Sequence, residues 1–230
     1  MRKAIVSGAN GFVGSAVVKE LISQGYEVYA LVRENHYDQV PINEMVRIVP
    51  FSLENIEALG EVIPINEYEA FYHFAWNGSA GVDRADTALQ LKNAQWTVEC
   101  LQMAKRLGCK RFVPAGSIME HETIAAVYTQ GNRPGAGYIY GSGKVAAHMM
   151  CMSMAVKEGI NLVWPKITNA YGPSERSPRL VNSTIRKCIA GEDPQFTAGT
   201  QNYDFVYIDD VARAFRLIGE KGKPSHHYLI

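Results

Sequence analysis

The sequence predicts an α/β protein built on a doubly wound parallel sheet of the Rossmann type, with a small C-terminal substrate lobe. Apolar runs of strand length alternate with segments in which apolar residues recur at helical spacing, and this alternation is typical of βαβ units. A glycine-rich loop directly follows the first apolar run. The length of 230 residues suits one Rossmann domain with an attached lobe.

The first βαβ unit is the clearest. Residues 4–6 predict a buried strand, and an apolar stripe from Val17 to Ile22 predicts a helix that Gly25 ends. Residues 27–32 then predict the second strand, parallel to the first.

The alternation continues through the middle of the chain. After Lys166 it is interrupted by glycine and proline residues. We therefore expect residues 1–167 to form the Rossmann domain and residues 168–230 to supply substrate-lobe segments interleaved with the last core elements. The further expected strands are residues 47–51, 70–75, 111–115 and 161–166, and the long helical patterns are residues 93–107 and 143–157.

Composition excludes several classes of partner. Hydrophobic residues make up 47% and charged residues 20% of the chain, and 23 basic side chains balance 23 acidic ones, so the net charge indicates neither a nucleic-acid nor a membrane partner. The four cysteines lack CxxC spacing, which favours reduced thiols over disulfides or a metal site. The first residues lack the features of a signal peptide, and no apolar run approaches a membrane span. We expect a cytoplasmic protein.

The glycine-rich loop lies between the first strand and the first helix, which is the context that a dinucleotide-binding loop requires. Glycines let the backbone approach a diphosphate, whose charge is met by free amides at the helix N-terminus. The alternative is a purely structural turn. The expected cofactor-binding residues of this loop are Gly8, Asn10, Gly11, Phe12, Val13 and Gly14.

The end of the second strand indicates the type of dinucleotide. In NAD-binding proteins an acidic residue about 20 residues past the glycines accepts the ribose hydroxyls, but Val32 and Arg33 occupy this place. A guanidinium cannot accept these hydrogen bonds and can bind a 2′-phosphate in a bidentate manner. We therefore expect NADP, with NAD as the second choice; the alternative is that Arg33 is an ordinary surface arginine.

Tyr140 and Lys144 stand four residues apart, so a helix places them on one face, about 6 Å apart along its axis. A nearby cation favours the phenolate, and we expect Lys144 to bring the pKa of Tyr140 closer to working pH. Such a phenol exchanges a proton with a substrate oxygen while hydride moves at the attached carbon. Ser117 follows the strand predicted at residues 111–115, at the sheet edge where ligands bind, and its hydroxyl can bond the same oxygen.

Together these motifs resemble the extended short-chain dehydrogenases/reductases, the NAD-dependent epimerase/dehydratase family that acts largely on nucleotide sugars. Two later stretches carry the same resemblance: residues 169–173 read Asn-Ala-Tyr-Gly-Pro, and residues 204–212 read Asp-Phe-Val-Tyr-Ile-Asp-Asp-Val-Ala. The similarity extends from residue 4 to the end of the chain.

The resemblance implies roles for individual residues. Ser117, Tyr140 and Lys144 are the implied catalytic triad, and Lys144 also contacts the nicotinamide ribose. Ala75, in the stretch His-Phe-Ala at residues 73–75, lies beside the cofactor. Asn169 is an implied substrate contact on the diphosphate side. The family often has arginine where Lys166 and Tyr203 stand. The candidate replacements for these substrate contacts are Arg179, which we select, and Arg176, Arg186 and Lys187; the alternative for each is a solvated surface residue.

Departures from the family pattern narrow the reaction. Family 4,6-dehydratases carry an Asp-Glu pair directly after the catalytic hydroxyl residue, where this chain has Ile118 and Met119; Glu120 could substitute only with a shifted backbone. Family 4-epimerases usually keep the acidic residue that Arg33 replaces. The favoured hypothesis is NADPH-dependent reduction of a nucleotide-linked 4-keto sugar. The alternatives are a nucleotide-sugar 4-epimerase with recycled cofactor and, in another class, a non-catalytic NADP sensor.

Other features leave more than one interpretation. The chain ends where the family normally continues its substrate lobe, so either the chain is short or the lobe is reduced. Surplus apolar residues on the two long helices, including Met149 and Met150, fit either core packing or the four-helix contact of a homodimer. Residues 76–81 either line the rim of the active site or form a simple loop. His148, His226 and His227 are interpreted as structural.

Overall fold

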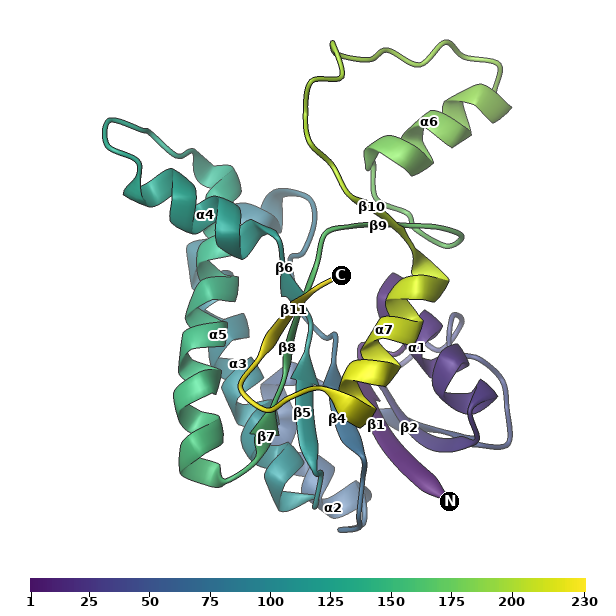
Figure 1. Cartoon of the computed structure of the whole chain (residues 1–230). Coiled ribbons are helices and arrows are strands. Elements are labelled where there is room, and N and C mark those ends of the chain that lie inside the picture. The colour runs from purple at the N-terminus through teal and green to yellow at the C-terminus, as the bar shows by residue number, and fades with distance from the viewer.

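The computed structural model describes residues 1–230 as an α/β fold around a parallel sheet (Figure 1). The sheet has the strand order β3-β2-β1-β4-β5-β7, and all its neighbouring pairs are parallel. The order reverses between β1 and β4, as in doubly wound folds, so the predicted fold class is confirmed. The strands are β1 (Arg2–Ser7), β2 (Tyr26–Val32), β3 (Val46–Pro50), β4 (Ala70–His73), β5 (Arg111–Pro114) and β7 (Asn161–Leu162).

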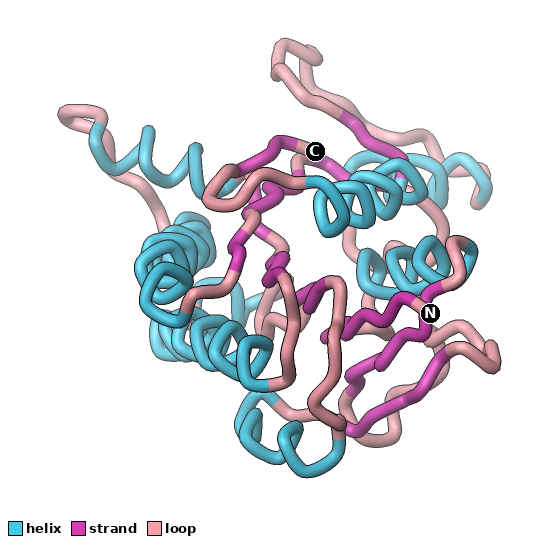
Figure 2. Tube along the Cα trace, turned by 60° about the horizontal axis from the view of Figure 1, so that its bottom comes forward, coloured by secondary structure: helices cyan, strands magenta, loops and turns pink.

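Helices cover both faces of this sheet, and Figure 2 shows the two groups on either side of the strands. Alternate residues of a strand point to opposite faces, so Ile5 belongs to one core cluster while Ala4 and Val6 belong to the other. The first cluster lies under α3 and α5, and the second lies under α1 and α7. The helices are α1 (Phe12–Ser23), α2 (Leu59–Val62), α3 (Thr87–Arg106), α5 (Ile139–Glu158) and α7 (Ile208–Lys221).

The strand expected at residues 161–166 is divided in two at Val163. The amide of Val163 still donates to the carbonyl of Phe112 in β5 (3.1 Å), but the next amide, of Trp164, donates to the carbonyl of His226 (3.0 Å). The chain therefore changes partners and continues as β8 (Trp164–Ile167), between β6 (Gly116–Ser117) and β11 (His227–Leu229). This second small sheet carries Ser117 beyond the carboxyl edge of the main sheet.

The remaining elements stand above that edge. In Figure 1, α6 and the segment that follows it rise above the body of the molecule at the upper right, and α4 lies at the upper left. β9 and β10 pair in parallel at the base of the α6 segment. These elements are α4 (Met119–Tyr128), β9 (Asn169–Tyr171), α6 (Leu180–Ile189) and β10 (Phe205–Tyr207), and the short 3-10 helices are η1 (Leu53–Ala58), η2 (Val82–Ala85) and η3 (Ala136–Tyr138).

Both long helices begin earlier than the periodicity indicates. α3 begins at Thr87, because Asp86 caps it by accepting a hydrogen bond from the amide of Leu89 (3.0 Å). α5 begins at Ile139, and its first turn therefore includes Tyr140. No helix combines the length with the apolar composition that crossing a membrane requires.

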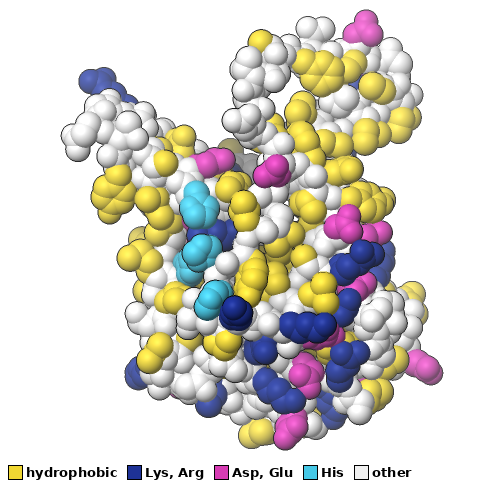
Figure 3. Space-filling view, in the orientation of Figure 1, with side chains coloured by type: hydrophobic (Ala, Val, Ile, Leu, Met, Phe, Trp, Pro, Cys, Tyr) yellow, Lys and Arg dark blue, Asp and Glu magenta, His cyan; other side chains and the backbone are white.

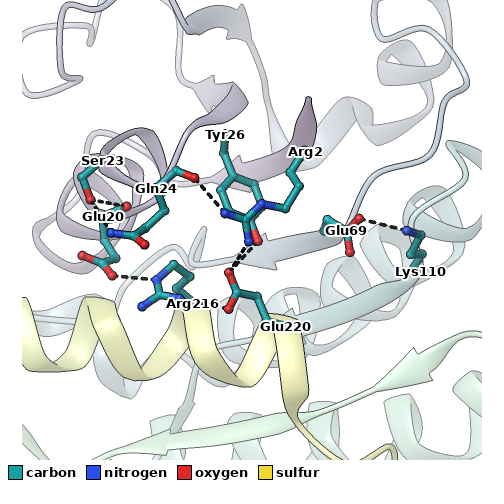
Figure 4. A network of polar contacts seen from close by, with 9 residues as sticks. All are labelled: Arg2, Glu20, Ser23, Gln24, Tyr26, Glu69, Lys110, Arg216 and Glu220. Carbon is teal, nitrogen blue, oxygen red and sulfur yellow. Dashed lines mark hydrogen bonds and ion pairs between the residues drawn. The ribbon is translucent and has the colours of Figure 1, made fainter.

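A polar network ties α7 to the first βα unit (Figure 4). The carboxylate of Glu220 accepts hydrogen bonds from Arg2 (2.8 Å), Tyr26 (2.9 Å) and Arg216 (2.9 Å). Arg216 also donates to Glu20 on α1 (2.7 Å). The network keeps α7 against α1, so the residues after β10 return to the Rossmann body.

Candidate active site

A cleft of about 740 Å³ runs along the carboxyl edge of the main sheet. It begins at the glycine-rich loop and ends at Ser117, Tyr140 and Lys144. A second cavity of about 390 Å³ adjoins this end and extends toward β9 and α6. The two spaces share the wall formed by Arg84, Ser117, Tyr140, Thr168, Ala170 and Arg179.

The glycine-rich loop has the shape that a dinucleotide diphosphate requires. A Cβ on Gly8, whose φ is +65°, would lie 2.8 Å from the amide nitrogen of Ala75, and a Cβ on Gly14 would overlap the carbonyl oxygen of Gly8. Helix α1 begins at Phe12, so its first amides have no partner within the helix. The residues therefore fit the expected cofactor. All six predicted loop residues line the cleft: Gly8, Asn10, Gly11, Phe12, Val13 and Gly14.

The end of the cleft beside the carboxyl ends of β2 and β3 would receive the adenosine part of a dinucleotide. Val32 and Arg33 line it at the end of β2, as expected, and Ser52 lies beside them. Glu54, at the start of η1, also lines this end. This carboxylate was not foreseen, because it follows β3 rather than β2.

Ala75 lines the cleft next to the loop. Its amide donates to Ser7 Oγ (3.3 Å), which also hydrogen-bonds His73 Nδ1 (2.8 Å). Burial, reinforced by the nearby Lys144 cation, lowers the pKa of His73 to about 3, so this imidazole is neutral. His73 thus holds the strand end against the glycine-rich loop without adding charge.

The predicted triad residues converge at the wall between the two cavities. Lys144 is 6% exposed, and its Nζ donates to the carbonyl of Ala115 (2.8 Å). The same atom lies 3.6 Å from the centre of the Trp76 ring and 5.8 Å from the centre of the Tyr140 ring. Ser117 Oγ accepts a hydrogen bond from the amide of Met119 (3.2 Å), and its hydroxyl also acts on Tyr140, whose pKa it lowers through a side-chain hydrogen bond.

The protonation of this pair differs from the expectation. Burial lowers the pKa of Lys144 to about 7, so part of the population is uncharged at neutral pH. Burial also raises the pKa of Tyr140 above its usual value, and the cations that oppose this rise are Arg84 and Arg179. The expectation that Lys144 sets the pKa of Tyr140 is therefore corrected: Lys144 is too strongly desolvated to supply a full charge.

The Tyr140 ring has two close neighbours, of which Arg84 was not predicted and Trp76 belongs to the segment expected at the rim. The Arg84 guanidinium lies 4.1 Å from the centre of the Tyr140 ring, and the Trp76 ring packs edge-on against the same phenol with centroids 5.9 Å apart. Residues 76–81 do line the cleft, in agreement with the first of the two interpretations. No motif identified Arg84, because its contact with Tyr140 joins η2 to α5 across the opening.

Behind Ser117 lies the buried carboxylate of Glu120, which is 1% exposed. Its Oε1 accepts hydrogen bonds from the Ser117 amide (2.9 Å) and from Trp164 Nε1 (3.0 Å). Its Oε2 lies 2.8 Å from His148 Nδ1 and 3.4 Å from Lys166 Nζ. Burial alone would raise the pKa of Glu120, but these hydrogen bonds and the lysine charge hold it below its usual range.

The position of Glu120 shows whether this carboxylate can reach the substrate as a dehydratase acid. Glu120 lines neither cavity, whereas Ile118 and Met119 line the second one. The carboxylate of α4 that does line the second cavity is Glu122. Glu120 is therefore no replacement for the acid–base pair.

The histidines do not form a metal site. The His148 ring stacks on Trp164 with centroids 4.3 Å apart, and Figure 3 shows histidine side chains in a row on this face. Nowhere in residues 1–230 do three or more potential ligand side chains gather closely enough to hold a metal ion.

The predicted substrate residues line the second cavity. Asn169 lies on β9, and Arg179 precedes α6. Asn182 joins them and carries a buried Nδ2 without a hydrogen-bond partner. The cavity therefore offers amide and guanidinium donors beside the aromatic rings of Tyr171, Tyr203 and Phe205.

The sequence is similar to a family of known proteins and to individual members with known names. A model of the NAD dependent epimerase/dehydratase family matches residues 4–230. The dTDP-glucose 4,6-dehydratase of Escherichia coli is 24% identical over 259 residues, which cover 99% of this chain and 71% of the relative. The dTDP-6-deoxy-L-talose 4-dehydrogenase (NAD(+)) of Aggregatibacter actinomycetemcomitans is 26% identical over 217 residues, which cover 90% of this chain and 76% of the relative.

The fold also has a match among solved structures. The UDP-N-acetylglucosamine 4-epimerase from Methanobrevibacter ruminantium M1, in complex with UDP-N-acetylmuramic acid, aligns with a TM-score of 0.81 at 19% identity. The alignment covers 100% of this chain and 76% of that chain. At this identity the match concerns the fold alone.

Proposed function

Because the chain belongs to the NAD-dependent epimerase/dehydratase family of enzymes, we propose that it reduces the 4-keto group of a nucleotide-linked sugar with NADPH. The observation that carries this proposal is the wall between the two cavities. A phenol, a serine hydroxyl and a lysine meet at or beside it, and Ile118 and Met119 occupy the two positions after Ser117 where dehydratases of the family carry their acid and base. Because the family consists of enzymes, the alternative of a non-catalytic NADP sensor is not favoured.

Each triad residue has a distinct task in this reaction. A bound NADPH supplies the hydride. Tyr140 gives its proton to the carbonyl oxygen, and the hydroxyl of Ser117 donates a hydrogen bond to the same oxygen. Lys144, which donates to Ala115, is positioned to bind the ribose of the nicotinamide.

The proposed preference for NADP rests on Arg33, which lines the adenosine end of the cleft. A guanidinium there binds a 2′-phosphate, whereas Glu54 would repel it. The 4-dehydrogenase relative carries NAD(+) in its name, so NAD is the second candidate. Titration of the protein with NADPH and NADH tests this: we expect tighter NADPH binding that Arg33→Ala removes. Equal affinity for both dinucleotides contradicts the preference.

The proposed substrate is a nucleotide sugar, held in the second cavity by Asn169 and Arg179. We further propose that residues 168–230 supply this lobe through β9, α6 and β10, while residues 1–167 bind the cofactor. The 4-dehydrogenase relative is named for a dTDP-linked 6-deoxy sugar and for chemistry at carbon 4, which is the reverse of the proposed reduction.

A homodimer is also proposed. The contact expected on the two long helices is shifted here to α5 and the neighbouring α4, because α3 exposes only Leu91 among its large apolar side chains. A second copy would pack the exposed apolar side chains of α4 and α5 into a four-helix contact. Sedimentation equilibrium tests this, with monomers at all concentrations as the contradicting result. The side chains are Ile124, Val127, Tyr128, Met149, Met150 and Val156.

The 4-epimerase remains the second candidate, since a 4-epimerase shares the fold. Cofactor labelled with deuterium at the transferred position distinguishes the two reactions. A reductase transfers one deuterium from added cofactor to each product molecule. An epimerase recycles its bound cofactor and gives an isomer without stoichiometric label, which would replace the reductase proposal.

A further inference from the structure

Arg84 is fixed over the face of the phenol that the reaction uses. Its guanidinium carbon lies 4.1 Å from the centre of the Tyr140 ring, and its Nη1 donates to the carbonyl of Ser79 (3.0 Å). The edge of Trp76 packs on the same phenol, with ring centroids 5.9 Å apart. The arginine thus has a hydrogen-bonded position, and it lines both cavities at their common wall.

Arg84 and Lys144 differ as sources of positive charge beside Tyr140. An arginine stays protonated at every pH at which a protein is folded, whereas burial lowers the pKa of Lys144 to about 7. The ammonium of Lys144 is also directed at the Ala115 carbonyl and the Trp76 ring. Arg84 is therefore the permanent cation in contact with Tyr140, and its attraction for the ring increases when the phenol becomes a phenolate.

We propose that Arg84 is a positioning residue of the reaction, which orients the Tyr140 ring and stabilises the phenolate left when the proton has moved to the substrate. The proposal deepens the proposed function and rests on it for the identity of the reaction. No motif of the sequence pointed to this residue.

The proton and the electrons balance without a further reagent. The hydride would leave the nicotinamide C–H bond of a bound NADPH, which is oxidised to NADP⁺, and would form the new C–H bond at the carbonyl carbon. The electron pair of the C=O π bond moves to oxygen, and that oxygen takes the proton from the breaking O–H bond of Tyr140. Water returns a proton to the phenolate after product release. Arg84 neither gains nor loses a proton and acts through its charge and its stacking contact.

Other charged groups act on Tyr140 from the elements around it. Lys144 lies one turn away on α5, Arg179 approaches from the segment before α6, and Glu120 lies behind Ser117 on α4. Arg84 and Arg179 favour the phenolate, and Glu120 opposes it. The effect of Arg84 is therefore measured as a difference between variants that keep the other groups unchanged.

The test reads the phenol directly and needs no substrate. A fluorinated tyrosine, whose phenol ionises at lower pH, is placed at position 140, and its ¹⁹F signal is followed during a pH titration. In Arg84→Met we expect the midpoint to rise by about one pH unit, the lower end of the effect of an opposite charge at this distance. Arg84→Lys keeps a charge but not the planar stack, so its midpoint should lie in between. Arg213→Met, which removes an exposed arginine on α7, should leave the midpoint unchanged.

An unchanged midpoint in Arg84→Met overturns the proposal. If circular dichroism shows that Arg84→Met does not fold, the test uses Arg84→Lys instead. A titration midpoint in Arg84→Lys equal to that of the parent protein then overturns the proposal. With a reducible substrate, the kcat of Arg84→Met should fall about tenfold, which corresponds to one pKa unit. Because the titration is independent of turnover, a shifted midpoint with no reductase activity would reject the proposed function and retain the role of Arg84 at Tyr140.

Discussion

The carboxylate of Glu120 accepts a hydrogen bond from the backbone amide of Ser117 at 2.9 Å, from the side opposite the cleft. The contact requires a residue without a side chain at position 116, because a Cβ there would lie 2.7 Å from Glu120 Oε1 and would overlap Trp164 Nε1. A buried charge beneath a short strand thus sets the place of the serine hydroxyl. This relationship connects α4, β6 and β8 behind the site.

Replacing Glu120 is expected to impair both catalysis and stability. Glu120→Ala removes the acceptor of the Ser117 amide and leaves Lys166 buried without its carboxylate, which should cost about 3 kcal/mol of stability. In protein that remains folded, kcat should fall more than KM rises, because the serine hydroxyl is displaced. Urea unfolding and steady-state kinetics measure the two effects. Glu61→Gln, on an exposed position of α2, is the matched control, and an unchanged kcat in Glu120→Ala contradicts the role.

Gly14→Ala is expected to abolish dinucleotide binding while the sheet stays folded. The added methyl group would overlap the Gly8 carbonyl and force the loop away from the path of the diphosphate. Calorimetric titration with NADPH should show a loss of at least about a hundredfold in affinity, equivalent to about 2.7 kcal/mol. The control is Gly135→Ala, where a Cβ meets no atom within 4 Å. Wild-type affinity in Gly14→Ala would be incompatible with the assigned loop.

Lys144 gives stability a specific pH dependence. Its pKa is about 7 when folded and near 10.4 when unfolded, so between these values the unfolded chain binds the extra proton. The contribution of Lys144 to stability therefore rises with pH across this window and is least favourable below pH 7. The stability of Lys144→Met relative to wild type should be higher at pH 7 than at pH 10 by on the order of 3 kcal/mol. Urea unfolding at both pH values measures this, and an equal difference at both would contradict it.

The Glu220 network predicts a pH dependence of the same sign as that of Lys144, but in the acid range. Burial alone would raise the pKa of this carboxyl, but Tyr26 and Arg216 bond it and lower the pKa overall. The stabilising effect of the Glu220 charge is therefore complete above about pH 4.3, the pKa of glutamate in the unfolded chain. It is lost as the pH falls through the lower pKa that Glu220 has in the folded protein. Glu220→Gln should cost about 1 kcal/mol near neutral pH, and less in acid. Thermal unfolding at the two pH values checks this; a cost that persists in acid would show that the charge is not responsible.

Much of the fold could be predicted because its signals are local. The strand at residues 4–6, the glycines that follow and the apolar stripe after Phe12 all belong to one contiguous βαβ unit. Tyr140 and Lys144 lie within one helical turn, so their proximity also follows from the sequence.

The remaining features depend on contacts between distant segments. The division of the strand at Val163 depends on His226, more than 60 residues later in the sequence. The contacts of Arg84 with Tyr140 and of Glu120 with Trp164 likewise cross the fold. The pKa of Tyr140 also differs from the prediction. It is governed mainly by desolvation, which comes from all the segments packed around this side chain.

The central claim is that Tyr140 protonates a carbonyl oxygen while NADPH is consumed. The most direct measurement is the absorbance of NADPH over time when the protein is mixed with a nucleotide-linked 4-keto-6-deoxy sugar. We expect absorbance to fall in proportion to the product formed, and Tyr140→Phe to abolish the fall while still binding NADPH. Consumption that persists in Tyr140→Phe, or isomerised product without any loss of NADPH, would contradict the claim.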